Sequence, residues 1–159
     1  MKRLLVSVAL VGVVVPVALR AAQTNGSPVE EGLRAFLENR LDPATLRITY
    51  SDIHPLFGGQ ELSIRGNGSV EAKFLWQKVE SPHQLPMAQV RELVELLLEI
   101  ESWRQFTPDR EPRPDESRAR LTIEVGGKSS EIWEWYNDLA VNNRLLRVRD
   151  HIRRASGLE

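Results

Sequence analysis

Apolar residues recur every three to four positions in three segments, which is the spacing expected on the buried face of a helix. These segments cover 29–41, 86–107 and 138–156, and their ends carry suitable helix signals. Ser27 is a favourable N-cap for the first helix, and Gly157 is a favourable stop for the last. The predicted apolar stripe of the last helix consists of Val141, Leu145, Val148 and Ile152.

In the segments between these helices the apolar spacing changes to two, which indicates strands with one buried face. A short strand is predicted over 46–50, followed by a hairpin over 61–77 with its turn at Gly66-Asn67-Gly68. We expect Asn67 and Gly68 both to adopt positive φ values there. A second hairpin follows over 121–136, with its turn at Gly126-Gly127. Its returning strand is predicted to place Trp133 and Trp135 on one face, with Ile132 and Tyr136 on the other.

The order of these elements predicts an α+β domain. We expect an antiparallel sheet of about five strands, built from two hairpins, with the helices packed on one face. A length of 159 residues with 42% hydrophobic residues suits one modest domain. The predicted organisation is a signal peptide or membrane anchor over 1–22, an N-terminal helical segment over 23–45, and the α+β domain over 46–155.

The first 22 residues have the composition of an export signal. Lys2 and Arg3 precede an uncharged apolar run from Leu4 to Leu19, and Ala21-Ala22 offers small residues for cleavage. Arg20 is unfavourable beside a cleavage site, so retention of the run as a membrane anchor is the alternative. We therefore expect an exported protein, periplasmic or extracellular, that contacts the membrane only if Leu4 to Leu19 is retained.

Several short motifs give the chain a resemblance to a family of exported bacterial domains of unknown function. They are Ile48-Thr49-Tyr50, a loop with Phe57-Gly58, the hairpin from Leu62 to Val70, a helix near 90–98, and Leu121-Thr122-Ile123. The resemblance covers about residues 46–155. It implies a small exported domain without implying an activity. The family usually carries a cysteine pair around the Phe-Gly, whereas this chain contains no cysteine.

Composition and motifs exclude several common chemistries. Without cysteine the chain has no thiolate nucleophile and no disulfide, and a formal net charge of -1 gives no electrostatic case for nucleic acid. Ser51, Asp52 and His54 are the residue types of a nucleophilic triad, but three residues within four positions seldom place a base between its two partners. No histidine pair has the spacing of metal ligands. We predict no catalytic residue, no cofactor and no metal site.

Two groups of side chains are candidates for an interaction surface. The paired tryptophans of the second hairpin could bind a partner if their sheet face is uncovered. A basic stripe on the last helix consists of Arg144, Arg147, His151 and Arg154. It could meet an anionic surface, although the favoured explanation of the stripe is pairing with Glu92, Glu95 and Glu99 of the preceding helix. The candidate residues are Trp133, Trp135, Tyr136, Arg144, Arg147, His151 and Arg154.

The favoured functional hypothesis is a non-enzymatic binding module of the cell envelope. It would hold an envelope protein or another component on a sheet face or on the loop from Ser51 to Gly59. The alternative is an extracytoplasmic hydrolase whose site converges from separate loops, for example His54 with Asp52, Asp109 or Asp115. A third reading is an anchored structural protein, which requires that the N-terminal run is retained.

Overall fold

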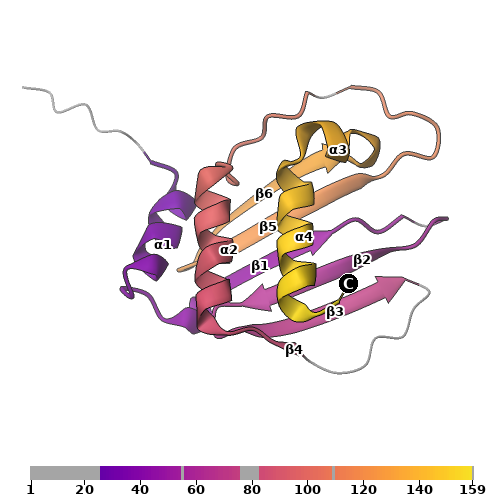
Figure 1. The fold of residues 1–159 in the computed structure, drawn as a ribbon. Coiled ribbons are helices and arrows are strands. Elements are labelled where there is room, and N and C mark those ends of the chain that lie inside the picture. The colour runs from indigo at the N-terminus through magenta and orange to yellow at the C-terminus, as the bar shows by residue number, and fades with distance from the viewer. Residues whose placement is uncertain (1–25, 55, 76–82, 109, 159) are drawn as a thin grey trace, which may run out of the picture.

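The computed structural model describes residues 26–54, 56–75, 83–108 and 110–158, which form one antiparallel sheet and a layer of helices (Figure 1). The predicted signal or anchor segment, together with Trp76 and Asp109, lies outside the described residues. The strands are β1 (Leu46–Ser51), β2 (Gly59–Arg65), β3 (Ser69–Leu75), β4 (His83–Gln84), β5 (Arg118–Val125) and β6 (Lys128–Trp135). The helices are α1 (Pro28–Leu37), α2 (Met87–Glu99), α3 (Leu139–Asn142) and α4 (Arg144–Ser156), with 3-10 turns η1 (Pro43–Thr45) and η2 (Tyr136–Asp138).

The sheet has the order β4-β3-β2-β1-β5-β6, and all neighbouring strands are antiparallel. The predicted α+β fold is confirmed, and the two-residue strand β4 extends the expected sheet at one edge. The first strand, β1, lies in the middle, because the hairpin β2–β3 flanks one of its sides and the hairpin β5–β6 flanks the other. Strands from the first and the second half of the chain therefore meet at β1.

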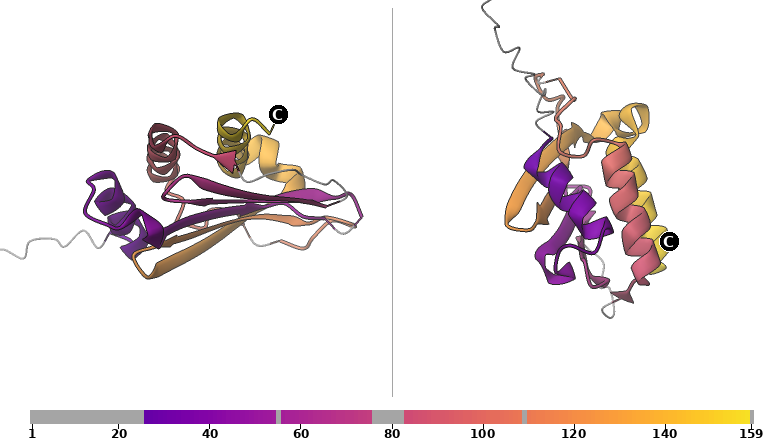
Figure 2. Two further views of the ribbon diagram at one scale, coloured as in Figure 1. Left: turned by 90° about the horizontal axis from the view of Figure 1, so that it is seen from below. Right: turned by 90° about the vertical axis from the view of Figure 1, so that its left-hand side faces the viewer.

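The helices lie on one face of this sheet, as predicted (Figure 2). α2 and α4 run side by side over it, and α1 packs against α2, β5 and β6. One core results, in which α1 contributes Val29, Leu33 and Phe36 to the apolar cluster of the sheet. Every second residue of the central strand, Leu46, Ile48 and Tyr50, is buried beneath the helices. Within the described ranges, no helix is both long enough and apolar enough to cross a bilayer.

The two hairpin turns use glycine in different ways. Gly126 and Gly127 both have positive φ (55° and 76°), as a two-residue turn matching the strand twist requires. In the first hairpin only Gly68 does (φ 90°), so the predicted positive φ of Asn67 was wrong. Asn67 instead accepts a hydrogen bond from the Ser69 N–H at 3.0 Å. The turn is a three-residue loop, and a Cβ at Gly68 would lie 2.3 Å from the carbonyl oxygen of Leu85.

The chain after β6 also departs from the prediction. Tyr136 belongs to η2 and is not part of the strand, so the inward face of β6 carries Ile132 and Glu134 instead. The predicted last helix is divided at Asn143, which adopts a left-handed conformation (φ 49°) between α3 and α4. This break turns Val141 away from the core, and Val141 is 83% exposed.

Candidate binding surface

No helix of the described chain covers the face of the sheet opposite α2 and α4 (Figure 2). Because side chains alternate along a strand, residues between the buried core positions point to this side. They are polar in β1, β2 and β5, where Arg47, Thr49, Ser63, Arg120 and Thr122 face outward. We call this surface the open face.

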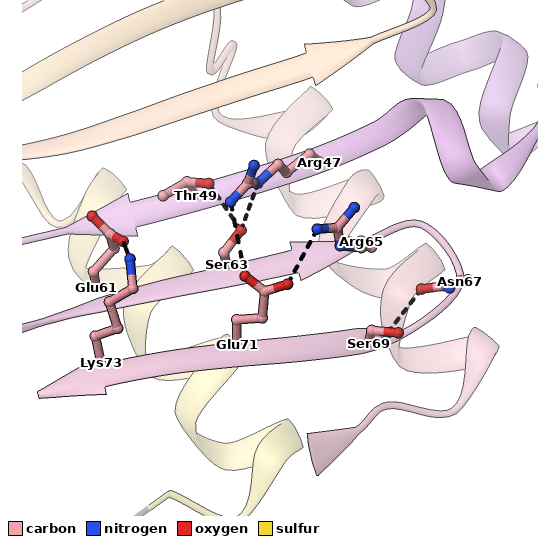
Figure 3. Close-up of polar contacts among 9 residues, drawn as sticks. All are labelled: Arg47, Thr49, Glu61, Ser63, Arg65, Asn67, Ser69, Glu71 and Lys73. Carbon is pink, nitrogen blue, oxygen red and sulfur yellow. Dashed lines mark hydrogen bonds and ion pairs between the residues drawn. The ribbon is translucent and has the colours of Figure 1, made fainter. Parts of the chain in front are cut away.

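Over β1 to β3 the polar side chains of the open face bind one another (Figure 3). The Arg47 guanidinium donates to the Ser63 hydroxyl at 3.0 Å, and Thr49 and Ser63 share a hydrogen bond of 3.1 Å. Across the β2–β3 hairpin, Lys73 binds Glu61 at 2.8 Å and Arg65 binds Glu71 at 3.2 Å. This part of the open face therefore carries three basic and two acidic side chains, joined by ion pairs.

At the other edge, the open face carries a stack of aromatic and guanidinium groups. Trp133 and Trp135 meet edge to face with their ring centroids 5.2 Å apart. The Arg118 guanidinium lies 3.9 Å from the Trp133 ring centroid and 4.5 Å from that of Trp135, while Arg110 lies 4.6 Å from the latter. The prediction that the two tryptophans share a face is confirmed, and the arginines leave Trp135 only 3% exposed.

The backbone beneath this stack is held by a residue that sequence reasoning missed. The side-chain amide of Gln105 donates to the Trp133 carbonyl at 2.8 Å and accepts from the Trp133 N–H at 2.9 Å. Gln105 therefore pairs with the outer edge of β6 as a neighbouring strand would. No local signal identifies such a contact, because 28 residues separate its partners.

Arg110 is held in its place over Trp135 by two carboxylates. It donates to both oxygens of Glu116, at 2.8 and 2.9 Å, and to Asp138 at 2.9 Å. The two hydrogen bonds from Arg110 to Glu116, with a further one from the Arg113 N–H, lower the pKa of Glu116 to about 2. The Glu116 carboxylate is thus ionised, and Arg110 balances its charge.

The side chain of Arg120, in contrast, makes no hydrogen bond or ion pair with any described residue. It lies between Ser51 of β1 and Trp133 of β6 in the strand register. Beside it, where β1 and β5 reach the loops, the surface forms a hollow of about 470 Å³. We call it the open-face hollow, and its walls include Ser51, Ile53, Ser117, Arg118, Arg120 and Trp135.

A second, smaller cavity of about 180 Å³ lies beyond the end of β1 and gathers the residues of the hydrolase hypothesis. Asp52, His54 and Asp115 line it together with Phe57 and Tyr136. The predicted convergence of His54 with Asp52 and Asp115 therefore occurs in the structure, whereas Asp109 lies outside the described residues.

The hydrogen bonds of His54 assign it a structural role in this cavity. Its Nδ1 accepts from the N–H groups of Leu56 and Phe57, at 3.0 and 3.2 Å, so this nitrogen carries no proton. Its Nε2 therefore donates to the Asp115 carbonyl, 2.6 Å away. Both ring nitrogens are engaged with backbone, and neither is available to move a proton for a substrate.

Asp52 and Ser51 are separated by the sheet itself. Asp52 is buried, and its carboxylate accepts hydrogen bonds from the Tyr50 hydroxyl at 2.9 Å and from the Gln60 N–H at 2.8 Å. Burial, with the Asp52 charge next in effect, raises the pKa of Tyr50 far above its ordinary value. Ser51 lines the open-face hollow instead. Ser51, Asp52 and His54 therefore do not assemble a nucleophile, a base and an orienting acid.

The basic stripe of α4 lies in the helical layer, on the other side of the sheet from Trp133 and Trp135. Arg147 binds Glu99 of α2 at 2.9 Å, and His151 lies 3.3 Å from the Gln89 carbonyl. Arg154 is exposed and donates to the Asp150 carbonyl of its own helix. The candidate residues therefore do not form one site, and Tyr136 lines the His54 cavity rather than either of these surfaces.

Arg144, the first residue of the stripe, connects α4 to α2. Its guanidinium donates to the carbonyls of Ile100, Glu101 and Arg104, at 2.9 to 3.1 Å, just beyond the end of α2. The Ile100 carbonyl is one of the groups that a helix C-terminus leaves without a backbone partner. Burial lowers the pKa of Arg144, although the nearby Glu134 opposes this effect.

Glu134 is a buried acid that the alternation along β6 turns toward the helices. It is 1% exposed, its oxygens have no hydrogen-bond partner in the described chain, and the nearest Arg144 nitrogen is 4.0 Å away. Burial raises the pKa of Glu134. The Arg144 charge opposes this rise, as does the Leu145 N–H, whose geometry falls short of a hydrogen bond.

Comparisons with protein-family models, with curated proteins and with solved structures found no match. The resemblance to exported bacterial domains thus stays a prediction. In the part of the chain that the structure describes, no group of three or more histidine or acidic side chains is placed to hold a metal ion.

Proposed function

We propose that the protein is a non-enzymatic binding module of the cell envelope that holds a protein partner on its open face. The observation that carries this proposal is the one-sided sheet, whose helices cover one face while the other presents an ordered polar surface. The self-paired side chains over β1 to β3 keep this surface flat and fixed, which reduces the entropy lost on binding.

Charge favours an acidic partner. Over β1 to β3 three basic side chains meet two acidic ones, and where β5 leaves the loop it adds Arg118 and Arg120. Glu124 and Glu131 of the open face lie toward the other end of the β5–β6 hairpin. A partner with acidic side chains would complement this edge and would be guided to it at low ionic strength. The export of the protein is part of the same proposal and is supported by the composition of residues 1–22.

Site-specific photo-cross-linking in the host tests the surface. A photoreactive residue in place of Thr122, on the open face, should give one discrete adduct, whereas the same residue in place of the exposed Glu95 of α2 should not. The partner, identified by mass spectrometry, should form the same adduct when both proteins are purified. Adducts from the Glu95 position alone, or from neither position, would overturn the proposal.

The intact mass of the protein in separated cell fractions tests its location. A soluble exported protein lacking about the first 22 residues is the expected result. A full-length protein in the membrane fraction would place the same module beside the bilayer. A full-length protein in the cytosol would overturn the envelope part of the proposal.

A further inference from the structure

Two residues that line the open-face hollow carry buried polar groups that no part of the described chain satisfies. The Trp135 Nε1–H and the Ser117 hydroxyl are both buried without a hydrogen-bond partner, and both residues line the hollow. Trp135 is more than nine-tenths buried, so surrounding solvent does not replace the missing acceptor. An unpaired buried donor is unfavourable, by about 1–3 kcal/mol, so a ligand group that accepts its hydrogen bond would be bound favourably there.

The charges around the hollow favour an anion. Arg120 and Arg118 both line it, and Arg120 has no partner in the described chain. Glu116 also lines the hollow, but Arg110 holds both of its oxygens and its side chain is fully buried. An incoming anion therefore meets an available guanidinium without opposition from an unbalanced carboxylate.

We propose that the open-face hollow binds a carboxylate of an acidic segment of a partner protein. Arg120 would hold the carboxylate through two parallel N–H donors, the arrangement that matches a planar acid to a guanidinium. The carboxylate would also bring acceptors to the unpaired donors of the wall. This inference rests on the proposed function and identifies the chemistry by which the open face recognises its partner.

A peptide fits the hollow better than an acidic sugar. Sugar recognition usually requires an aromatic ring face, yet Trp135 is covered by Arg110 and Arg118, and Arg118 also stacks on Trp133. Ile53 and Pro112 supply apolar groups at the wall, and Ile53, which is 39% exposed, suits a side chain of a bound peptide. A glucuronate and an inorganic phosphate are therefore the competing ligands for the test.

Nuclear magnetic resonance titration of the full chain tests the proposal. The probes are an acetylated tetraglutamate amide, its tetraglutamine counterpart, glucuronate and inorganic phosphate, with the Trp135 indole N–H resonance as the reporter. Tetraglutamate should shift this resonance saturably, and tetraglutamine should not. Arg120→Gln should weaken tetraglutamate binding about tenfold. Arg65→Gln is the matched control, because Arg65 lies on the open face and is already paired with Glu71.

Each contrary result has a definite meaning. No response to tetraglutamate would overturn the carboxylate site. An equal loss of binding in Arg65→Gln would also overturn it, because only a general charge effect would then remain. A response to phosphate or glucuronate but not to tetraglutamate would overturn the choice of a peptide. A Thr122 cross-link without tetraglutamate binding would overturn this inference alone. Tetraglutamate binding without a cross-link would instead overturn the proposed protein partner and leave a site for small acids.

Discussion

At the scale of single residues, two glutamates show how surroundings decide the effect of an acidic side chain. Glu116 receives hydrogen bonds from Arg110 and from the Arg113 N–H, whereas Glu134 lies under α4 without any. The pKa of Glu116 is accordingly lowered and that of Glu134 is raised. Ionised Glu116 therefore stabilises the folded protein, while ionised Glu134 opposes folding.

Substitution of Glu134 should therefore stabilise the protein. The raised pKa means that the folded state binds a proton more tightly than the unfolded state, so stability falls as the pH rises through the raised pKa. Glu134→Gln removes this loss, and we expect the free energy of unfolding at pH 7 to rise by about 1 kcal/mol. Urea unfolding at pH 4 to 8 measures the difference between the two proteins. A loss of stability at pH 7 would show that the carboxylate is needed beside Arg144.

Glu116→Gln should have the opposite pH profile. Its pKa is about 2 in the folded protein, against an ordinary value of 4.5, so its contribution is complete above about pH 4.5 and disappears as the pH falls toward 2. The variant should be less stable than the parent at pH 6, and the difference should shrink between pH 4.5 and 2. Acid unfolding followed by tryptophan fluorescence measures this. A difference that is constant with pH would refute the assigned ion pair.

At the scale of elements, local patterns predicted the hairpins and the helix faces because these depend on neighbours in sequence. The apolar alternation placed Leu46, Ile48 and Tyr50 on the buried face, and Ser27 caps α1 as expected. The end of β6 and the break at Asn143 escaped prediction, because apolar Tyr136 and Val141 continue both patterns.

The open-face hollow could not be predicted, because it is assembled from β1, β5, β6 and the loop before β5. Nothing in the sequence distinguishes Arg120 from Arg65. Only the structure shows that Arg65 has an acidic partner and that the Arg120 side chain has none among the described residues. The predicted tryptophan pair was the nearest local signal, since Trp135 lines the hollow.

The contact between α2 and α4 yields an element-scale prediction. Arg144 donates to three carbonyls beyond the end of α2, and its loss would also leave Glu134 without a nearby cation. Arg144→Gln should lower the free energy of unfolding by about 3 kcal/mol, whereas Arg154→Gln should change it by less than about 0.5 kcal/mol. Chemical denaturation of both variants measures this.

The double variant Arg144→Gln with Glu134→Gln gives the control for this contact. It should recover about 1 kcal/mol of the loss, because the isolated buried carboxylate is then absent. Equal, small effects of the two arginine variants would mean that the basic stripe is free for a partner and does not hold the helices together.

At the scale of the whole molecule, the chain divides its two tasks between the two faces of one sheet. The face beneath α2 and α4 carries the apolar core, and the other carries the paired polar groups, Arg120 and the open-face hollow. A side chain on the open face can therefore change with little effect on the core. Such a separation would leave the proposed binding surface free to vary without loss of stability.

Neighbouring residues of β1 test this division directly. Ile48 is fully buried beneath the helices, while Thr49 faces outward and shares a hydrogen bond with Ser63. Ile48→Ala should lower the free energy of unfolding by about 3 kcal/mol, whereas Thr49→Ala should lower it by less than about 1 kcal/mol. Urea unfolding of both variants at pH 7 gives the two values. Comparable large losses would mean that the open face is packed as tightly as the helical face, and no surface would then remain on the sheet for a partner.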